Sequence, residues 1–179
     1  MPHIRRIIAG VSGDPGNLPA IRYAAGVARA CDAAFVPVHA WLPSGPELAV
    51  CPFPVDHLVE EWQDAAWQRL WNSLDMAFGG FPPDVTTQPL ILRGNPGQVL
   101  VGTASRAGDA LVIGTGRRGT VSRLRRGAVS RYCLAHACCP VTAVPPPELD
   151  RAAARGVRGW ARRRQAPGPD TIASGTPRR

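Results

Sequence analysis

The sequence contains no lysine, and all 21 of its basic residues are arginine. A Walker A phosphate loop and Schiff-base chemistry both need a lysine side chain, so this absence argues against both classes. The sequence also lacks any run of about 18 apolar residues, which a membrane-spanning helix would need. Its first residues, "MPHIRRIIAGVSGD", lack the long apolar stretch of a secretory signal. We therefore expect a cytoplasmic location and no membrane span.

Local patterns for metal binding and hydrolysis are missing as well. The five cysteines, an odd number, show no C-x-x-C spacing, which argues against a disulfide framework and a zinc site. The sequence has neither G-x-S-x-G nor H-E-x-x-H. Its four histidines show no local spacing for a triad or a metal. We expect no metal site and no catalytic residues, although an enzyme built from distant residues stays open.

The formal net charge of +8 is unevenly distributed. Residues 117–131 hold six arginines and no acid, residues 148–179 carry a net +5, and the remaining residues carry −3. The end of the chain is poor in apolar residues and rich in turn formers. We therefore predict one domain over 1–147 and a basic C-terminal tail over 148–179 that is disordered in isolation. Such a tail suits an anionic partner, with a solvated extension as the alternative.

Apolar runs alternate with helical patterns along the predicted domain. Strands are expected over 4–11, 33–41, 85–92, 109–115 and 139–145, and helices over 18–32, over 55–78, from about 96, and over 127–137. Pro37 and Pro89 fit poorly inside central strands, because proline lacks the N–H that a strand ladder uses. This order predicts an α/β three-layer sandwich, with a five-stranded parallel sheet and helices on both faces. Ligands bind such sheets at the carboxyl ends of the strands, near the reversal of strand order.

The stretch "VIGTGRRGTVSRLRRGAVSR" (112–131) follows the fourth predicted strand and contains G-x-G-x-x-G. The dinucleotide fingerprint with that spacing belongs after the first strand and needs a later acidic residue, yet no acid lies between Asp109 and Glu148. Gly114 and Gly127 instead frame a loop ahead of a predicted helix. Glycine at both ends lets the backbone approach an anion, and the helix start offers unpaired N–H groups. A phosphate-binding loop and a solvated basic loop both fit this pattern.

Several segments, taken in order, resemble the universal stress protein domain. They are "GVSGDPG", "AIRYAAGVA", "VPVHAW", "GNPGQVLVGTASRAGDALVIGT" and "GAVSRYCLAHACCPVTAVP", and the resemblance covers residues 4–145. It implies an adenine nucleotide alpha hydrolase-like fold and a homodimer formed through the last strand, 139–145. One subset of the family binds ATP through G-x2-G-x9-G-[S/T] after the fourth strand, with an Asp after the first strand contacting the adenosine. Another subset lacks the motif and does not bind ATP.

This chain keeps the ends of that motif and departs from it elsewhere. Arg117 stands in place of the second glycine, Ala128 in place of the Ser/Thr, and Ser12 in place of the Asp, while Ser130 retains a hydroxyl nearby. The resemblance therefore implies a weakened ATP site, with Mg²⁺ accompanying the nucleotide. The predicted cofactor-binding residues are Gly10, Val11, Ser12, Val38, Gly114, Thr115, Arg117, Gly127, Ala128, Val129 and Ser130.

Three functions stay open from the sequence, and the first is favoured. It is a non-catalytic stress-response regulator that binds an adenine nucleotide weakly. The second is an interaction module of the same fold that binds no nucleotide, its arginine-rich loop and tail contacting a protein or nucleic acid. The third is a nucleotide-dependent enzyme of the same superfamily. His39 is interpreted as a structural residue, and Trp62, Trp67 and Trp71 as packing or interface residues.

Overall fold

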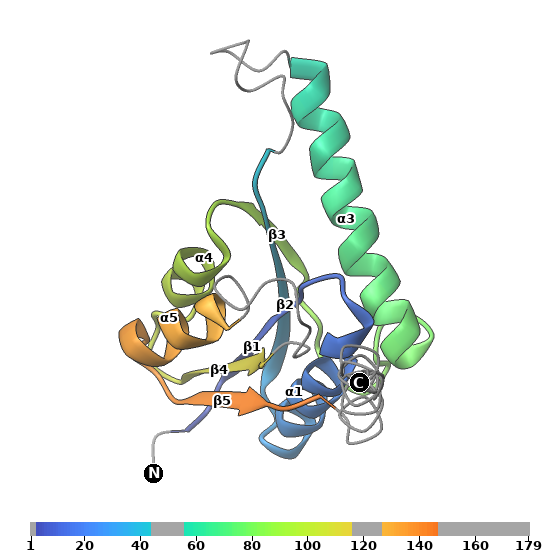
Figure 1. The fold of residues 1–179 in the computed structure, drawn as a ribbon. Helices are drawn as coiled ribbons and strands as arrows, with labels where there is room; N and C mark the ends of the chain where they lie inside the picture. Colours follow the sequence, from blue (N-terminus) through green and yellow to red (C-terminus); the bar gives the residue numbers. More distant parts are fainter. Residues whose placement is uncertain (1–2, 44–55, 116–126, 147–179) are drawn as a thin grey trace, which may run out of the picture. The chain divides into compact units, whose positions relative to one another are not determined.

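The computed structural model describes residues 3–43, 56–115 and 127–146, and of residues 56–58 the backbone alone (Figure 1). Predictions about Arg117 and about the tail from 148 onward lie outside these residues. The strands are β1 (Arg6–Gly10), β2 (Ala34–Trp41), β3 (Leu90–Arg93), β4 (Asp109–Gly114) and β5 (Val141–Val144). The helices are α1 (Leu18–Ala30), α3 (Asp56–Phe78), α4 (Pro96–Thr103) and α5 (Ala128–His136), and a short 3-10 turn spans Pro15–Asn17.

The five strands form one sheet in the order β3-β2-β1-β4-β5, and every neighbouring pair is parallel. From β1 the chain moves to one side through β2 and β3, then crosses to the other side of β1 through β4 and β5. The strand order therefore reverses between β1 and β4, where sheets of this kind leave a crevice at their carboxyl ends. The predicted five-stranded parallel sheet is confirmed.

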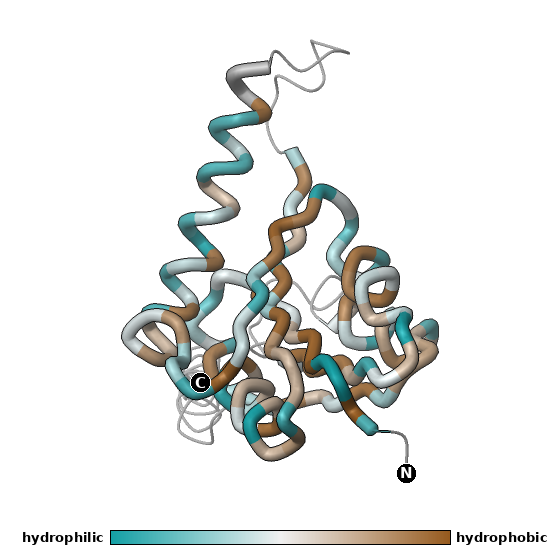
Figure 2. The backbone as a smooth tube through the Cα atoms, turned by 180° about the vertical axis from the view of Figure 1, so that it is seen from behind, coloured by the Kyte–Doolittle hydropathy of each residue, from teal (hydrophilic) through white to brown (hydrophobic). Residues whose placement is uncertain are grey.

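Two helices cover each face of the sheet (Figure 1). α1 and α3 pack on one face against a core that includes Ile7 and Phe35. α4 and α5 pack on the other face against a core that includes Ile8 and Leu111. Successive residues of a strand point to opposite faces, so Ile7 and Ile8 enter different cores and both are fully buried. This burial on both sides explains the near-continuous apolar strands, brown in Figure 2, and confirms the three-layer sandwich.

The predicted third strand, 85–92, is wrong over its first half. β3 begins only at Leu90, and before it a single isolated bridge joins Thr87 to Phe35. The Phe35 N–H donates to the Thr86 carbonyl (2.9 Å) and the Gln88 N–H donates to the Phe35 carbonyl (2.8 Å), so Gln88 faces β2 and Pro89, the next residue, faces away from it. The missing N–H of Pro89 therefore does not interrupt the pairing with β2. β3 itself is only four residues long.

Pro37 is fully buried in the middle of β2, although β2 has a neighbour on each side. The carbonyl of Val38 points to the β1 side, where it accepts a hydrogen bond from the Val11 N–H (2.8 Å). Backbone groups of successive strand residues alternate in direction, so Pro37 faces the β3 side. The ladder between β2 and β3 starts only at Val38, paired with Leu90. Pro37 therefore faces β3, as Phe35 does, but has no N–H to donate, and this missing donor interrupts the β2–β3 ladder between the hydrogen bonds of Phe35 and the Val38–Leu90 pair.

α3 confirms the long helix predicted over 55–78. Ala66, Leu70 and Leu74, one turn apart, are fully buried and form its core-facing side. Arg22 of α1 donates hydrogen bonds to the Met76 and Ala77 carbonyls and so satisfies two acceptors of the last turn. The amino-terminal half of α3 extends beyond the carboxyl end of β2 (Figure 1). Most of this helix is therefore exposed to solvent, and only its second half is anchored in the core.

A buried ion pair joins the starts of the two central strands. Asp109 of β4 is paired with Arg6 of β1 in the strand register, and Arg6 donates to both carboxylate oxygens at 2.8 and 2.7 Å. The Asp109 side chain is 1% exposed, and the Arg106 N–H donates to it as well (2.9 Å). Burial alone would raise the pKa of Asp109, but the hydrogen bonds from Arg6 and the Arg106 N–H hold it below its usual value. The charged form of Asp109 therefore stabilises the fold.

We expect Asp109→Ala to lower the free energy of unfolding by about 2–4 kcal/mol, because it leaves the Arg6 guanidinium without its buried partner. The depressed pKa means that this stabilisation is complete above about pH 4 and is lost as pH falls through the folded-state pKa. Urea unfolding followed by circular dichroism at several pH values measures both effects. The control is Asp84→Ala, which breaks the half-exposed pair of Arg29 with Asp84. A loss of stability as large in the control as in Asp109→Ala would contradict this account.

Candidate functional site

A cavity of about 300 Å³ opens at the carboxyl ends of β1 and β4, where the strand order reverses. Its walls come from the loop after β1, the end of β2, α4, the end of β4 and the first turn of α5. Of the predicted cofactor-binding residues, the structure places nine around this cavity: Gly10, Val11, Ser12, Val38, Gly114, Thr115, Gly127, Val129 and Ser130. Ala128 is exposed on α5 and does not line the cavity. Arg117 lies outside the described residues.

The apolar part of the cavity is formed by Val38, Leu100 and Ile113, which belong to the core between the sheet and α4 and α5. Gly10 is needed here, because a Cβ atom on it would lie 2.9 Å from the Leu100 side chain. The glycine thus lets α4 approach the end of β1 closely. An apolar wall of this kind can take the face of a planar ring.

The first turn of α5 forms the polar wall. Gly127 caps the helix with a left-handed backbone (φ +88°), and among the residues that the structure describes no side chain caps the first N–H groups. A Cβ atom on Gly127 would meet none of these residues within 4 Å, so the left-handed backbone conformation is what favours glycine. Free N–H groups and the positive end of the helix dipole attract an anion. α5 therefore presents a phosphate-binding geometry to the cavity.

Asn17 connects the ends of the two central strands. Its Nδ2 donates to the Gly10 carbonyl at the end of β1 (2.7 Å). Its Oδ1 lies so close to Gly114 that a Cβ atom at 114 would overlap it. The Ser130 hydroxyl in turn donates to the Gly114 carbonyl (3.0 Å). Because this hydroxyl has one proton, Ser130 can accept a further hydrogen bond but cannot donate one to a phosphate in this arrangement.

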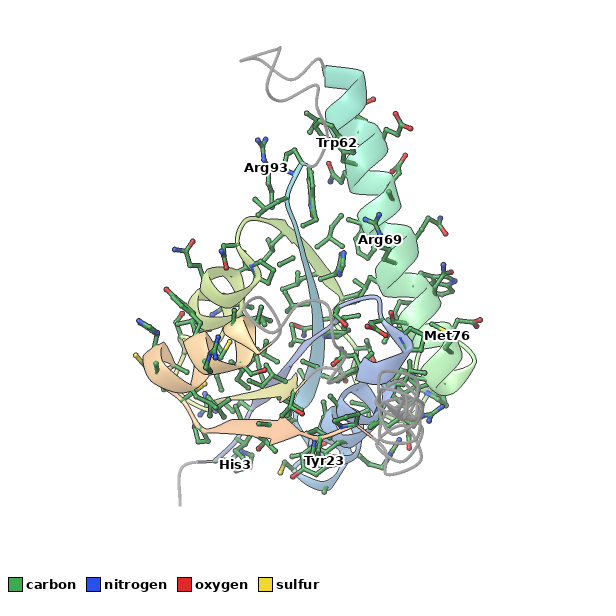
Figure 3. The ribbon with its side chains drawn as sticks, in the orientation of Figure 1. His3, Tyr23, Trp62, Arg69, Met76 and Arg93 are labelled. Atoms are coloured by element: carbon green, nitrogen blue, oxygen red, sulfur yellow. The ribbon has the colours of Figure 1, made fainter. Side chains whose placement is uncertain are left out.

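The loop after β1 is folded by its own side chains. Asp14 Oδ1 accepts from the Gly16 N–H (3.1 Å), and the Asp14 N–H donates to Ser12 Oγ (3.3 Å). Asp14 and Ser12 both line the cavity. The stem of Arg69, on α3, packs over the left-handed Gly13, with carbons 3.5–3.7 Å from where a Cβ would stand (Figure 3). This loop therefore brings a carboxylate to the cavity at residue 14, two positions after Ser12.

His39, at the end of β2, was interpreted from the sequence as structural, and the structure gives it a structural contact. It is buried, and its Nδ1 lies 2.8 Å from the Val11 carbonyl oxygen. A carbonyl only accepts, so Nδ1 carries the proton in this contact. His39 also lines the cavity, as do Asn17, Pro96 and Leu100, which the sequence reasoning did not include. Only Asn17 gave a sequence signal, because it lies in the loop after the first predicted strand.

The described residues contain no group of three or more histidines, cysteines or acids that could hold a metal ion. Burial raises the pKa of the Cys133 and Cys139 thiols, which keeps them protonated and unreactive at neutral pH. In the same part of the chain, no helix is both long and apolar enough to cross a membrane. The groups that the described part of the cavity offers to a ligand are apolar side chains and backbone N–H groups.

Comparison with known proteins agrees with this arrangement. The sequence profile of the Universal stress protein family matches residues 3–145. Universal stress protein UspA from Lactobacillus plantarum is similar with a TM-score of 0.58 and 19% identity, over 79% of this chain and 98% of that one. A universal stress protein from Archaeoglobus fulgidus in complex with dAMP has a TM-score of 0.51 and 18% identity, over 80% and 99%. A universal stress protein in complex with cAMP has a TM-score of 0.50 and 19% identity, over 80% and 98%.

No curated protein matches the sequence. The strand order and the two helical layers define an α/β protein of the adenine nucleotide alpha hydrolase-like class. Because the family profile covers most of the chain, the chain belongs to the universal stress protein family.

We expect Gly114→Ala to lower the free energy of unfolding by about 1–3 kcal/mol, because its methyl group would collide with Asn17. Asn17→Ala alone removes the hydrogen bond to the Gly10 carbonyl and costs about 1–2 kcal/mol. The double variant removes the collision, so it should lose at least about 1 kcal/mol less than the sum of the single losses. Chemical unfolding of all four proteins measures this coupling. Strictly additive losses would show that Asn17 does not constrain residue 114.

Proposed function

We propose that this protein is a non-catalytic, cytoplasmic stress-response regulator that binds an adenine nucleotide, ATP in the first instance, at the carboxyl ends of β1 and β4. The observation that carries the proposal is one cavity that joins an apolar wall (Val38, Leu100, Ile113) to the start of α5, which no side chain of the described residues caps. The apolar wall suits the base, and the helix start suits the phosphates. A volume of about 300 Å³ is at the lower end for small-molecule sites, which favours a single nucleotide over a dinucleotide.

Two relatives of this fold support the choice of nucleotide, since they are complexes with dAMP and with cAMP. Their identity to this chain is below 20%, so the argument depends mainly on the cavity itself. Mg²⁺ that accompanies ATP would be held by the phosphates and by water, because the described residues supply no cluster of metal ligands.

We expect the affinity to be modest. Ser12 replaces the carboxylate that the resemblance implies after β1, and Asp14 already uses one oxygen to cap the next turn. Ala128 offers no hydroxyl, and the proton of Ser130 is directed to Gly114. Binding would then depend on backbone N–H groups and on the positive charge of residues 117–131, which hold six arginines and no acid in the sequence.

Equilibrium titration of the full chain with ATP tests this function, and we expect a dissociation constant in the micromolar range. Gly127→Asp should weaken binding at least about tenfold, because it places a negative charge where the phosphates would lie. Gly79→Asp is the matched control, since Gly79 also has a positive φ (+73°) and open space around it, but lies directly after α3, away from the cavity. We expect it to bind ATP within about twofold of wild type.

No detectable binding at millimolar ATP, or equal effects of the two substitutions, would contradict the proposal. Hydrolysis of bound ATP well above the uncatalysed rate would instead favour an enzyme.

The second candidate is an interaction module of the same fold that binds no nucleotide. Two sequence observations favour it. Arginine is dense in residues 117–131 and 148–179, and the glycine motif departs from the ATP-binding pattern. Its signature would be salt-dependent binding of an anionic partner that truncation after Pro147 abolishes, together with no binding of ATP.

We also propose a homodimer through β5. β5 is an edge strand, and Thr142 and Ala143 are exposed. The Val144 carbonyl accepts from the Thr115 N–H on the β4 side, so the backbone groups of Ala143 point away from β4 to the free edge. Unpaired edge groups of this kind pair readily with a second strand.

Ala143→Pro should dissociate this dimer, because it removes an outward N–H without touching the ladder to β4. Sedimentation equilibrium of wild type and variant measures the change, which we expect to be at least about tenfold in the dimer dissociation constant. A wild-type monomer at high protein concentration, or a variant dimer as tight as wild type, would refute a dimer through this edge.

A further inference from the structure

One side of α3 presents two tryptophans between carboxylates. Trp67 is 38% exposed and Trp71 44% exposed. Glu60, Asp64 and Asp75 are exposed too. The five positions are separated by four, three, four and four residues, so at 3.6 residues per turn they fall in one row along the helix. We call this row the acidic–aromatic stripe.

The stripe is distinct from the surfaces that the fold already uses. The core-facing side of α3 is formed by Ala66, Leu70 and Leu74. The periodicity of 3.6 residues per turn also places Arg69 and Met76, both labelled in Figure 3, on the flank of the helix opposite the tryptophans. No residue of the stripe lines the cavity between β1 and β4. The stripe therefore offers a second surface, independent of nucleotide binding.

One of the tryptophans is held in place. The ring of Trp71 packs edge to face with Phe81 of the loop after α3, with centroids 5.0 Å apart and planes at 83°. Phe81 is itself 45% exposed and widens the apolar surface. An aromatic ring fixed before binding loses less conformational freedom when a partner covers it. Exposed tryptophan is also costly to leave in water, and it is typical of the centres of interfaces.

Charge decides which partner fits. If a second copy of α3 packed antiparallel, centred between the two tryptophans, Asp64 of one copy would lie close to Asp75 of the other. In a parallel pair each carboxylate would face its own equivalent. Both arrangements oppose like charges across a small interface, which is unfavourable. Nucleic acid and anionic lipid are disfavoured for the same reason, so the charge of the stripe selects a cationic partner.

We propose that the acidic–aromatic stripe binds a basic polypeptide segment that presents arginines along one face. A guanidinium stacks on the face of a tryptophan ring and also pairs with a carboxylate through two hydrogen bonds. Lysine lacks this planar, two-pronged geometry, so arginine is preferred. Asp64 and Asp75 are eleven residues apart, a rise of about 16 Å, which three turns of a partner helix match. The interface is small, so the complex is transient, with a dissociation constant in the micromolar range.

The test uses the full chain and two synthetic helical peptides that differ at one set of positions. The first carries arginines spaced by four, three and four residues on one face and leucines beside them, and the second carries glutamates in place of the arginines. Isothermal titration should show micromolar binding of the arginine peptide, weakened about tenfold as salt rises from about 50 to 200 mM. The glutamate peptide should not bind. Equal binding of both peptides, or binding insensitive to salt, would overturn the proposal.

Neighbouring carboxylates on α3 provide matched variants. Glu60→Gln removes a charge from the stripe, and Glu61→Gln removes the same charge about 100° around the helix. We expect the first to weaken binding at least about threefold and the second less than about 1.5-fold. The double variant Asp64→Asn with Asp75→Asn should weaken it about tenfold or more. All four side chains are exposed, so the variants should keep the thermal unfolding of the wild type.

Equal effects of Glu60→Gln and Glu61→Gln would mean that the stripe is not the binding surface. A dimer that Trp67→Asp dissociates would show that a second copy of the chain covers the stripe, contrary to the charge argument.

Discussion

The parallel pairing of β1 with β4 is the contact on which the rest of this molecule depends. It joins the two halves of the sheet, because β2 and β3 continue from one side of it and β5 from the other. Arg6 and Asp109 hold the two strands at their starts, and Asn17 lies between their ends. The cavity exists because the chain leaves these two strands in opposite directions. The pairing of β1 with β4 therefore determines both the arrangement of the sheet and the position of the cavity.

This shared origin limits the chemistry of the site. At the rim of the cavity, Asn17, Asp14 and Ser130 already use hydrogen-bonding atoms to hold the backbone. The N–H groups at the start of α5 have no such partner among the described side chains. Under the proposed function, recognition of the phosphates would depend on backbone geometry, which tolerates several nucleotides more readily than a set of dedicated side chains would.

The architecture could be predicted from the sequence because the central strands contain short apolar runs, as in "IIAGV" and "ALVIG". The third strand was predicted to begin too early, because the missing donor that interrupts its ladder is Pro37 on the neighbouring β2, which the pattern of the third strand itself does not show. Nine of the residues that the family resemblance implies as cofactor-binding line the cavity, because they lie at the strand ends and in the loops that follow them. The hydrogen bond of Asn17 to the Gly10 carbonyl could not be predicted, and for His39 only a structural role could be, without its partner Val11, since both contacts depend on which elements lie beside the end of β1. The exposure of Trp67 and Trp71 likewise needed the packing of α3, because the sequence alone leaves the direction of a long helix open.

The proline-bounded gap between β2 and β3 makes the two sides of the sheet unequal. β1 and β4 are hydrogen-bonded on both sides, whereas β3 is held along four residues and one isolated bridge. Local opening should therefore begin at β3, so that amide protons there exchange with solvent well before those of β1 and β4. α3 contacts β3 too, but its buried side packs on β2 and α1, which ties this helix to the better-bonded part of the sheet. The molecule can then loosen at β3 while its central strands, and the cavity at their ends, keep their shape.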